Sequence, residues 1–178
     1  MGHAVADDSR FKALIRDIAD FPSPGIGFKD ITPLLGDGAA WSAAVAGLAA
    51  LVARHHPTRI IGIEARGFLV GAPVAHHLGI GFVPVRKPGK LPYETSAVSY
   101  SLEYGQDSLE MHVDALTAGE RVVIVDDVLA TGGTAAAAAE LVRRSGGEVA
   151  GLAFLLELSF LSGRDRLGGH AVDALLRY

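Results

Sequence analysis

The stretch from Val122 to Thr134, VVIVDDVLATGGT, constrains the fold of this chain more than any other part of it. Its first four residues are apolar and predict a buried strand, which ends at Asp126 and Asp127. A turn of small residues follows and leads into an alanine-rich run from Ala135, which predicts a helix. A strand that enters a helix through a short loop is the repeating unit of α/β folds.

The loop between this strand and helix has the chemistry of a phosphate site. The backbone N–H groups of residues 131–134 would lie at a helix N-terminus without intrahelical partners, and Gly132 and Gly133 would let an anion approach closely. A Walker-type loop carries a Lys after its last Gly, but Thr134 stands there, which argues against nucleoside triphosphate hydrolysis. The expected ligand is therefore a single phosphate monoester.

The two acids before the loop indicate a sugar. Asp126 and Asp127 would lie at the carboxyl end of the strand, where open α/β sheets bind their ligands. Because neighbouring strand residues point to opposite sides, at least one could accept hydrogen bonds from vicinal hydroxyls. Acids and loop together predict a ribose 5-phosphate site, with an ordinary strand-to-helix loop as the alternative.

Composition limits the remaining possibilities. A chain of 178 residues, 49% hydrophobic and 20% charged, is expected to form one domain over residues 1–178. It has no cysteine for disulfides or thiolate metal sites, which is compatible with a cytoplasmic location. Early charged residues argue against a signal peptide, and the longest apolar run, 38–53, is too short to span a membrane. A net charge of −4 without a basic tract favours neither nucleic acid nor membrane as a partner.

Periodicity predicts the other elements. Four helices are expected: over 9–18, from Asp37 to about 55, from after Phe68 to Leu78, and from Ala135 to Ser145. Strands are expected over 60–63, 82–85, 148–156 and 171–176, with hairpin strands over 97–103 and 108–113 joined by 104–107 and a polar loop over 162–169. The expected fold is α/β, with a mainly parallel central sheet flanked by helices and right-handed crossovers.

Basic residues gather after one of these strands. Arg86, Lys87 and Lys90 follow the strand over 82–85, and Arg66 follows its neighbour over 60–63. Cations at adjacent strand ends would make a concentrated anion site. The alternative is a solvated basic loop.

At this point the sequence resembles a known family. The stretch from Val122 resembles the signature with which type I phosphoribosyltransferases bind phosphoribosyl diphosphate (PRPP). Further stretches resemble the adenine-specific branch of that family, in order: FPSPGIGFKDITPLL from Phe21, EARGF from Glu64, VRKPGKLP from Val85, SYSLEYG from Ser99 and, more loosely, LELSFLSGR from Leu156.

The resemblance implies a role for each part of the PRPP site. Asp126 and Asp127 would face the ribose, and the diphosphate would be held by Arg66, Arg86 and Lys90, with Lys87 also among the substrate-binding residues. The 5-phosphate would bind the loop formed by Ala130, Thr131, Gly132, Gly133 and Thr134.

The resemblance also implies a base-binding hood over about residues 1–35. Phe28 would stack on adenine, and the backbone around Gly27 and Lys29 would read its polar edge. Some family members carry a larger aliphatic residue and Arg at these two flanking positions. Leu158 could close the other face of the base. Phe28 and Leu158 could instead be core residues.

The implied reaction is displacement of diphosphate from C1 of the ribose by N9 of adenine, giving AMP. Arg66 and Glu103 are the expected catalytic residues, with Glu103 as acid/base. A flexible hairpin lid over about 92–113 would exclude water, with Tyr104 shaping it. Mg²⁺ would arrive bound mainly through PRPP, without a separate protein metal site.

The family usually forms homodimers, so a homodimer is expected here. Two alternatives remain open from the sequence. One is a phosphoribosyltransferase for hypoxanthine, xanthine or orotate. The other is a regulator that binds PRPP or a purine nucleotide without turnover.

Overall fold

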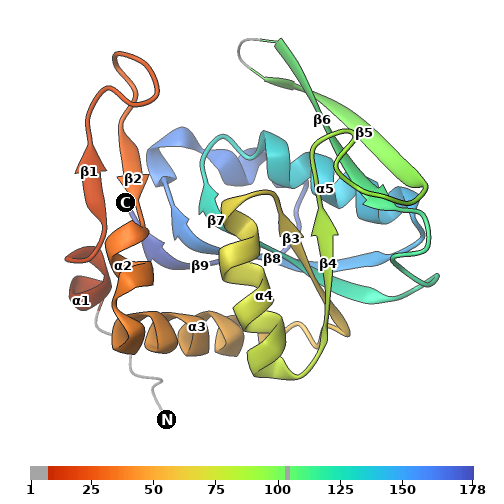
Figure 1. Cartoon of the computed structure of the whole chain (residues 1–178), viewed down its shortest axis with the longest axis horizontal. Helices are drawn as coiled ribbons and strands as arrows, with labels where there is room; N and C mark the ends of the chain where they lie inside the picture. The colour runs from red at the N-terminus through yellow and green to blue at the C-terminus, as the bar shows by residue number, and fades with distance from the viewer. Residues whose placement is uncertain (1–7, 103–104) are drawn as a thin grey trace. The chain divides into compact units, whose positions relative to one another are not determined.

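The computed structural model describes residues 8–102 and 105–178 (Figure 1). The chain forms two compact units, residues 1–47 and 48–178. Among the described residues, no helix has the length and apolar character needed to cross a membrane.

The 48–178 unit is built on a five-stranded parallel sheet, which confirms the expected α/β fold. In spatial order the strands are β4 (Gly81–Val85), β3 (Arg59–Ile63), β7 (Arg121–Leu129), β8 (Glu148–Glu157) and β9 (Val172–Arg177). The chain proceeds from β3 to one edge and from β7 to the other. Strand order therefore reverses between β3 and β7, and ligands of open α/β sheets bind at such a point.

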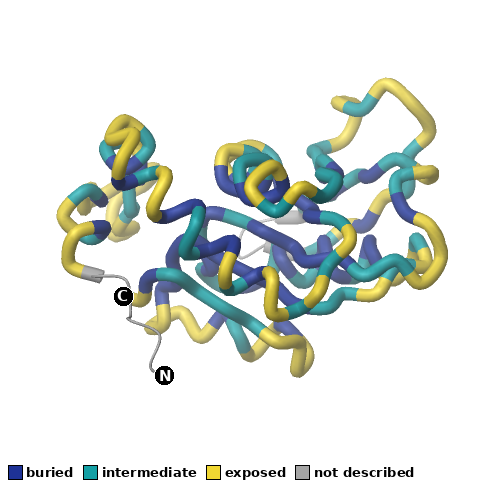
Figure 2. The backbone as a smooth tube through the Cα atoms, turned by 90° about the horizontal axis from the view of Figure 1, so that it is seen from below, coloured by how far each residue is buried: buried dark blue, intermediate teal, exposed yellow. Residues whose placement is uncertain are grey.

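Helices α4 (Arg66–Leu78) and α5 (Gly133–Arg144) cover opposite faces of this sheet. On α4, a β-carbon at Gly71 would lie 3.6 Å from the Ile60 side chain. On α5, Leu141 belongs to the buried cluster that contains Ile61. Ile60 and Ile61 are strand neighbours that point to opposite faces, so each face has its own helix. Strands β7 and β8 contain the longest buried runs of the sheet, and Figure 2 shows the buried backbone gathered in the interior.

The central strand is longer than expected. The prediction that it ends at Asp126 is wrong, because β7 runs to Leu129 and pairs with β8 through its last residues, with Leu129 opposite Glu157. The predicted polar loop over 162–169 contains the short 3-10 helix η2 (Gly163–Leu167), and a second one, η1 (Ser159–Leu161), comes just before it. Both acids therefore lie within a paired strand, which fixes their backbone.

The predicted hairpin is present as β5 (Thr95–Leu102) and β6 (Gly105–His112). Its second strand begins closer to the turn than expected, since Gly105 pairs with Leu102 and Asp107 lies inside β6 rather than in the connection. Leu109 and Met111 belong to the same buried cluster as residues of α5. The hairpin is thus packed against the sheet unit along part of its length.

The first unit contains α1 (Asp8–Lys12), β1 (Arg16–Ile18), β2 (Phe28–Asp30), α2 (Thr32–Gly36) and the start of α3 (Gly38–Ala53). The predicted helix over 9–18 is wrong beyond Lys12, because Arg16–Ile18 pairs antiparallel with Phe28–Asp30. Strand pairing between distant segments here overrides helical periodicity. The expected start of α3 is confirmed: Ala40 N donates to Asp37 Oδ1 at 2.9 Å.

Candidate active site

A pocket of about 530 Å³ lies at the carboxyl ends of β3 and β7, where the strand order reverses. It is lined by most of the residues that the sequence assigned to PRPP. These are Arg66, Lys87, Asp126, Asp127, Ala130, Thr131, Gly132, Gly133 and Thr134. Segments far apart in the sequence therefore meet around one cavity.

The phosphate loop has the predicted place at the start of α5. The first helical hydrogen bond runs from Ala136 N to Gly132 O at 2.9 Å, so the N–H groups of residues 133–135 precede the ladder. Gly132 has a φ of +81°, and a β-carbon there would lie 2.3 Å from the carbonyl oxygen of Gly163. A β-carbon on Gly163 would in turn lie 2.2 Å from Ala130 O.

Gly163 is a site-shaping residue that the sequence analysis did not single out. In the sequence, Gly163 lies in the LELSFLSGR stretch, five residues after Leu158. Two glycines from distant segments thus permit the close approach that shapes the phosphate loop.

Both acids line the pocket, where Asp127 is buried, with 5% of it exposed, and Asp126 is partly buried. Burial raises the pKa of Asp126 well above its ordinary value, and the neighbouring Asp127 charge raises it further. Burial also raises the pKa of Asp127, with Arg66 opposing the shift. A β-carbon on Gly67 would lie 2.5 Å from Asp126 Oδ1, so only Gly lets α4 begin this close to the acids.

Arg66 balances part of this negative charge. Its Nε lies 2.5 Å from Asp127 Oδ2, an oxygen that accepts no hydrogen bond of regular geometry among the described residues. The Arg66 side chain is 43% exposed whereas that of Asp127 is 7% exposed. The Arg66 guanidinium group is thus the more exposed partner of the pair, and the Asp127 carboxylate is the buried one.

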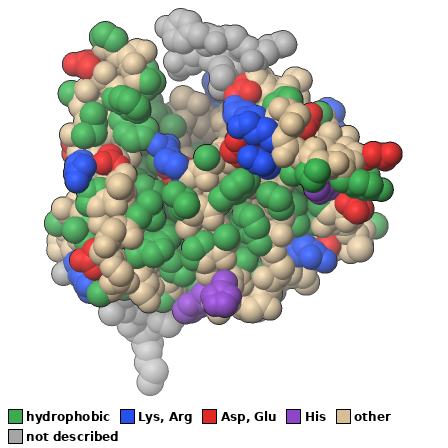
Figure 3. All heavy atoms as spheres, viewed as in Figure 1, with side chains coloured by type: hydrophobic (Ala, Val, Ile, Leu, Met, Phe, Trp, Pro, Cys, Tyr) green, Lys and Arg blue, Asp and Glu red, His purple; other side chains and the backbone are tan. Residues whose placement is uncertain are grey.

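Glu64 organises the basic loop. Arg86 Nε lies 3.2 Å from its Oε2, Lys90 forms an ion pair with its Oε1, and Lys87 N donates to Oε2 at 3.0 Å. Although burial opposes ionisation, hydrogen bonds from Lys90 and the Lys87 amide lower the pKa of Glu64. Figure 3 shows basic side chains gathered beside acidic ones on the face that it displays. Arg86 and Lys90 are therefore held by Glu64, and neither lines the pocket itself.

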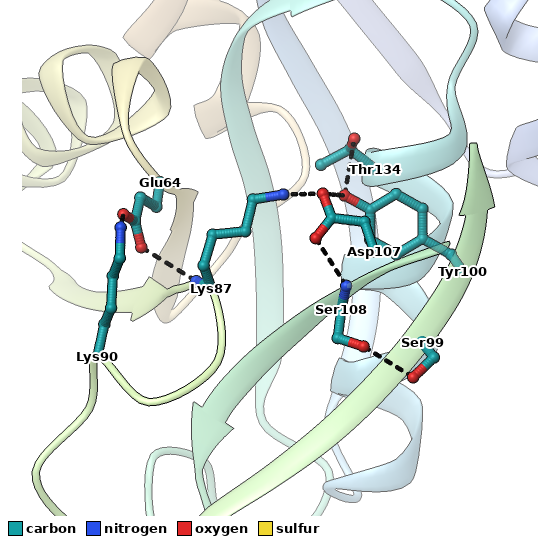
Figure 4. A network of polar contacts seen from close by, with 8 residues as sticks. All are labelled: Glu64, Lys87, Lys90, Ser99, Tyr100, Asp107, Ser108 and Thr134. Atoms are coloured by element: carbon teal, nitrogen blue, oxygen red, sulfur yellow. Dashed lines mark hydrogen bonds and ion pairs between the residues drawn. The ribbon is translucent and has the colours of Figure 1, made fainter. Parts of the chain in front are cut away.

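The Lys87 side chain extends into the pocket and forms an ion pair with Asp107 on β6 (Figure 4). The Tyr100 hydroxyl donates to Asp107 Oδ2 at 3.2 Å and lies 3.4 Å from Thr134 Oγ1. Tyr100 and Asp107 also line the pocket and were not assigned from the sequence. In the sequence, Tyr100 lies within the SYSLEYG stretch and Asp107 comes shortly after it.

Of the expected base-binding residues, Leu158 belongs to the 48–178 unit and does not line this pocket, whereas Gly27, Phe28 and Lys29 belong to the first unit. Phe28 lies in β2 of the first unit, with its ring 5.0 Å from that of Phe21 in an edge-to-face contact, and Lys29 forms an ion pair with Asp17. Leu158 is buried and its N–H donates to Leu129 O at 2.9 Å. Glu103 and Tyr104 lie outside the described residues.

Comparison with known proteins identifies the class to which this fold and site belong. Residues 35–167 match the model of the phosphoribosyl transferase domain, and the chain belongs to the phosphoribosyltransferase family. Within it, the chain belongs to the adenine phosphoribosyltransferases, as the following relatives show. It is 58% identical to that of Desulfitobacterium hafniense over 168 residues, covering 94% of this chain and 97% of the relative.

Solved structures agree. The adenine phosphoribosyltransferase of Thermoanaerobacter pseudethanolicus superposes with a TM-score of 0.94 at 53% identity, covering 96% of this chain and 99% of that one. The Saccharomyces cerevisiae enzyme, solved with an imino-altritol bisphosphate and adenine, has a TM-score of 0.91 at 39% identity, covering 95% and 98%. The family and activity expected from the sequence are thereby confirmed.

Proposed function

We propose that the pocket between β3 and β7 transfers the 5-phosphoribosyl group of PRPP to N9 of adenine, forming AMP and releasing diphosphate. The observation that carries this proposal is the meeting of a helix N-terminus, two neighbouring acids and two cations around one cavity. These are the groups needed for a monoester, a vicinal diol and a diphosphate. The yeast relative, which was solved with adenine and a sugar bisphosphate analogue, supports both substrates.

In this proposal the 5-phosphate accepts hydrogen bonds from the N–H groups and hydroxyls of residues 131–134. The ribose hydroxyls donate to Asp126 and Asp127. Arg66 and Lys87 contact the diphosphate directly, while Arg86 and Lys90 contribute from the loop that Glu64 holds. Each end of PRPP is thereby fixed, which orients C1 toward the base.

The chemical step breaks the bond between C1 and the diphosphate oxygen and forms the bond between C1 and N9. Negative charge builds up on the leaving diphosphate, and fixed cations at Arg66 and Lys87 stabilise it more than they stabilise the bound reactant. The N9 proton must also leave, and Glu103 is the proposed acceptor. The hairpin over about 92–113 is the proposed lid that excludes water as a competing nucleophile.

Mg²⁺ bound through PRPP would supply further positive charge to the diphosphate. Within the described part of the chain, no group of three His, Cys, Asp or Glu side chains could hold a metal. Carboxylate oxygens are ligands that Mg²⁺ prefers, and the Asp126 and Asp127 side chains that line the pocket fit a role beside a metal carried by the substrate. The ligands of the Mg²⁺ ion would then be mainly oxygens of the substrate rather than a set of protein side chains.

The roles of Gly27, Phe28, Lys29 and Leu158 at the base stay predictions. So do the homodimer, the cytoplasmic location and the lid role of Tyr104.

The decisive experiment incubates the purified chain with adenine, PRPP and Mg²⁺ and quantifies AMP and diphosphate. Equimolar formation of both is expected, and hypoxanthine, xanthine and orotate should compete weakly. Faster turnover of one of these bases would replace adenine as the substrate. PRPP binding without AMP formation would instead favour the regulatory alternative.

A further inference from the structure

The Lys87 ammonium group, which the proposed function assigns to the diphosphate, already has a carboxylate partner inside the pocket. It forms an ion pair with Asp107, and both side chains line the cavity (Figure 4). The pair is only partly shielded, with 37% of the Lys87 side chain and 24% of the Asp107 side chain exposed. A ligand entering the pocket can therefore reach it.

A carboxylate at this place opposes the binding of a polyanion. Asp107 repels the diphosphate and also competes with it for Lys87. Lys87 must exchange one anionic partner for another when the diphosphate binds.

The backbone around Lys87 is anchored, so this exchange requires only side-chain movement. Lys87 N donates to Glu64 Oε2 at 3.0 Å. The preceding residue, Arg86, is bridged to Glu110 by hydrogen bonds of 2.9 Å and 2.7 Å in both directions. Only the flexible Lys87 stem reaches from this anchored loop to Asp107.

Asp107 does not become an unsatisfied charge when Lys87 leaves. Its Oδ1 accepts from Ser108 N at 2.8 Å, and its Oδ2 accepts from the Tyr100 hydroxyl at 3.2 Å. Two neutral donors thus remain for the carboxylate, which keeps the free-energy penalty of releasing the cation small. Glu64 differs, because its carboxylate is 9% exposed and holds two cations together with a main-chain N–H.

We propose that Asp107 is a displaceable counter-ion of Lys87. It holds the ammonium group in the pocket before substrate arrives, yields it to the diphosphate of PRPP, and takes it back as diphosphate leaves. Asp107 is thus a positioning residue that acts through Lys87. The inference rests on the proposed function, because it requires Lys87 to bind diphosphate.

The test measures binding of inorganic diphosphate and of PRPP to the wild-type chain and to Asp107→Asn by calorimetry. Removing the competing charge should lower both dissociation constants by about two- to tenfold, the range expected for a partly exposed ion pair. Glu148→Gln is the matched control, because it changes net charge equally but removes an ion pair with Arg121 where β7 and β8 begin, away from the pocket. It should leave both constants unchanged.

A Lys87→Met background shows whether Asp107 acts through Lys87. Lys87→Met should weaken diphosphate binding, and adding Asp107→Asn should then bring a smaller gain than in the wild-type chain, because only the direct repulsion is left to remove. In steady-state assays, Asp107→Asn should lower KM for PRPP and the inhibition constant of diphosphate together without raising kcat. Asp107→Ala, checked for folding by circular dichroism, should shift binding in the same direction.

The possible results are distinct. Unchanged or weaker diphosphate binding by a folded Asp107→Asn chain would overturn the counter-ion role, and so would an equal gain in the Lys87→Met background. A wild-type chain that binds neither diphosphate nor PRPP would overturn the proposed function itself.

Discussion

Arg66 and Asp127 form one ion pair, with Nε 2.5 Å from Oδ2, although the sequence assigned them to different parts of the substrate. Asp127 is the second of the two adjacent acids in β7, and Arg66 is the first residue of α4. The cation expected at the diphosphate therefore also neutralises a buried acid expected at the ribose. Binding of the diphosphate at Arg66 is therefore coupled to the charge of Asp127, which is expected to face the ribose.

Arg66→Gln should affect both stability and substrate binding. The KM for PRPP should rise at least about tenfold, since a cation at the diphosphate is lost. The free energy of unfolding should fall by about 1–3 kcal/mol, because Asp127 stays buried without its partner. Urea unfolding and initial rates measure the two effects.

The double variant Arg66→Gln/Asp127→Asn separates them. Stability should recover while KM for PRPP stays high, because both expected ligand contacts are missing. Normal saturation by PRPP in either variant would contradict the assignment of this pair to the substrate.

Gly132→Ala should deform the phosphate loop. A β-carbon at this left-handed position would collide with the carbonyl oxygen of Gly163, so unfolding free energy should fall by about 2–4 kcal/mol. Gly133→Ala provides the comparison for stability alone, since the nearest atom to its β-carbon would be 3.5 Å away. Equal melting temperatures for the two variants would mean that the close approach of Gly163 does not restrict which residue the loop tolerates at position 132.

Glu103→Gln tests the proposed acid/base residue. We expect kcat to fall by about ten- to a thousandfold while the dissociation constant for PRPP stays close to that of the wild type. Rapid-quench measurement of AMP, combined with PRPP calorimetry, distinguishes loss of chemistry from loss of binding. If turnover is unaffected, Glu103 has no part in the mechanism.

Glu157 makes the stability of the sheet unit depend on pH. Arg164 donates to its two carboxylate oxygens at 2.6 Å and 2.7 Å, and this interaction lowers the pKa of Glu157 below 4.5. A lowered folded-state pKa means that the stabilisation is present above about pH 4.5 and is lost as the pH falls through the lowered value.

Glu157→Gln should therefore reduce the unfolding free energy at pH 7 by about 1–3 kcal/mol, a range reduced because Arg164 is partly exposed. The difference from the wild type should shrink below about pH 4.5, as measured by urea unfolding at several pH values. Glu140→Gln, in a surface pair with Arg143, is the control and should show little change at either pH. A difference that persists at low pH would show that the ion pair is not its source.

The sequence by itself determined the parts of this protein that depend on contiguous residues. The apolar run before Asp126, the glycines of the phosphate loop and the cations after β4 are local patterns, and each was recognisable with its chemistry. The parallel sheet followed because strands separated by helices have few other ways to pack. The family followed from several such patterns in one order.

Only the tertiary structure decided which charges meet. The pairing of Lys87 with Asp107, the holding of Arg86 and Lys90 by Glu64, and the need for Gly163 under the phosphate loop all join residues from separate elements. The early end of α1 has the same origin, since Arg16–Ile18 pairs with a strand that begins at Phe28. Strand register and the packing of elements bring these residues together, and the local patterns in the sequence did not predict these pairings.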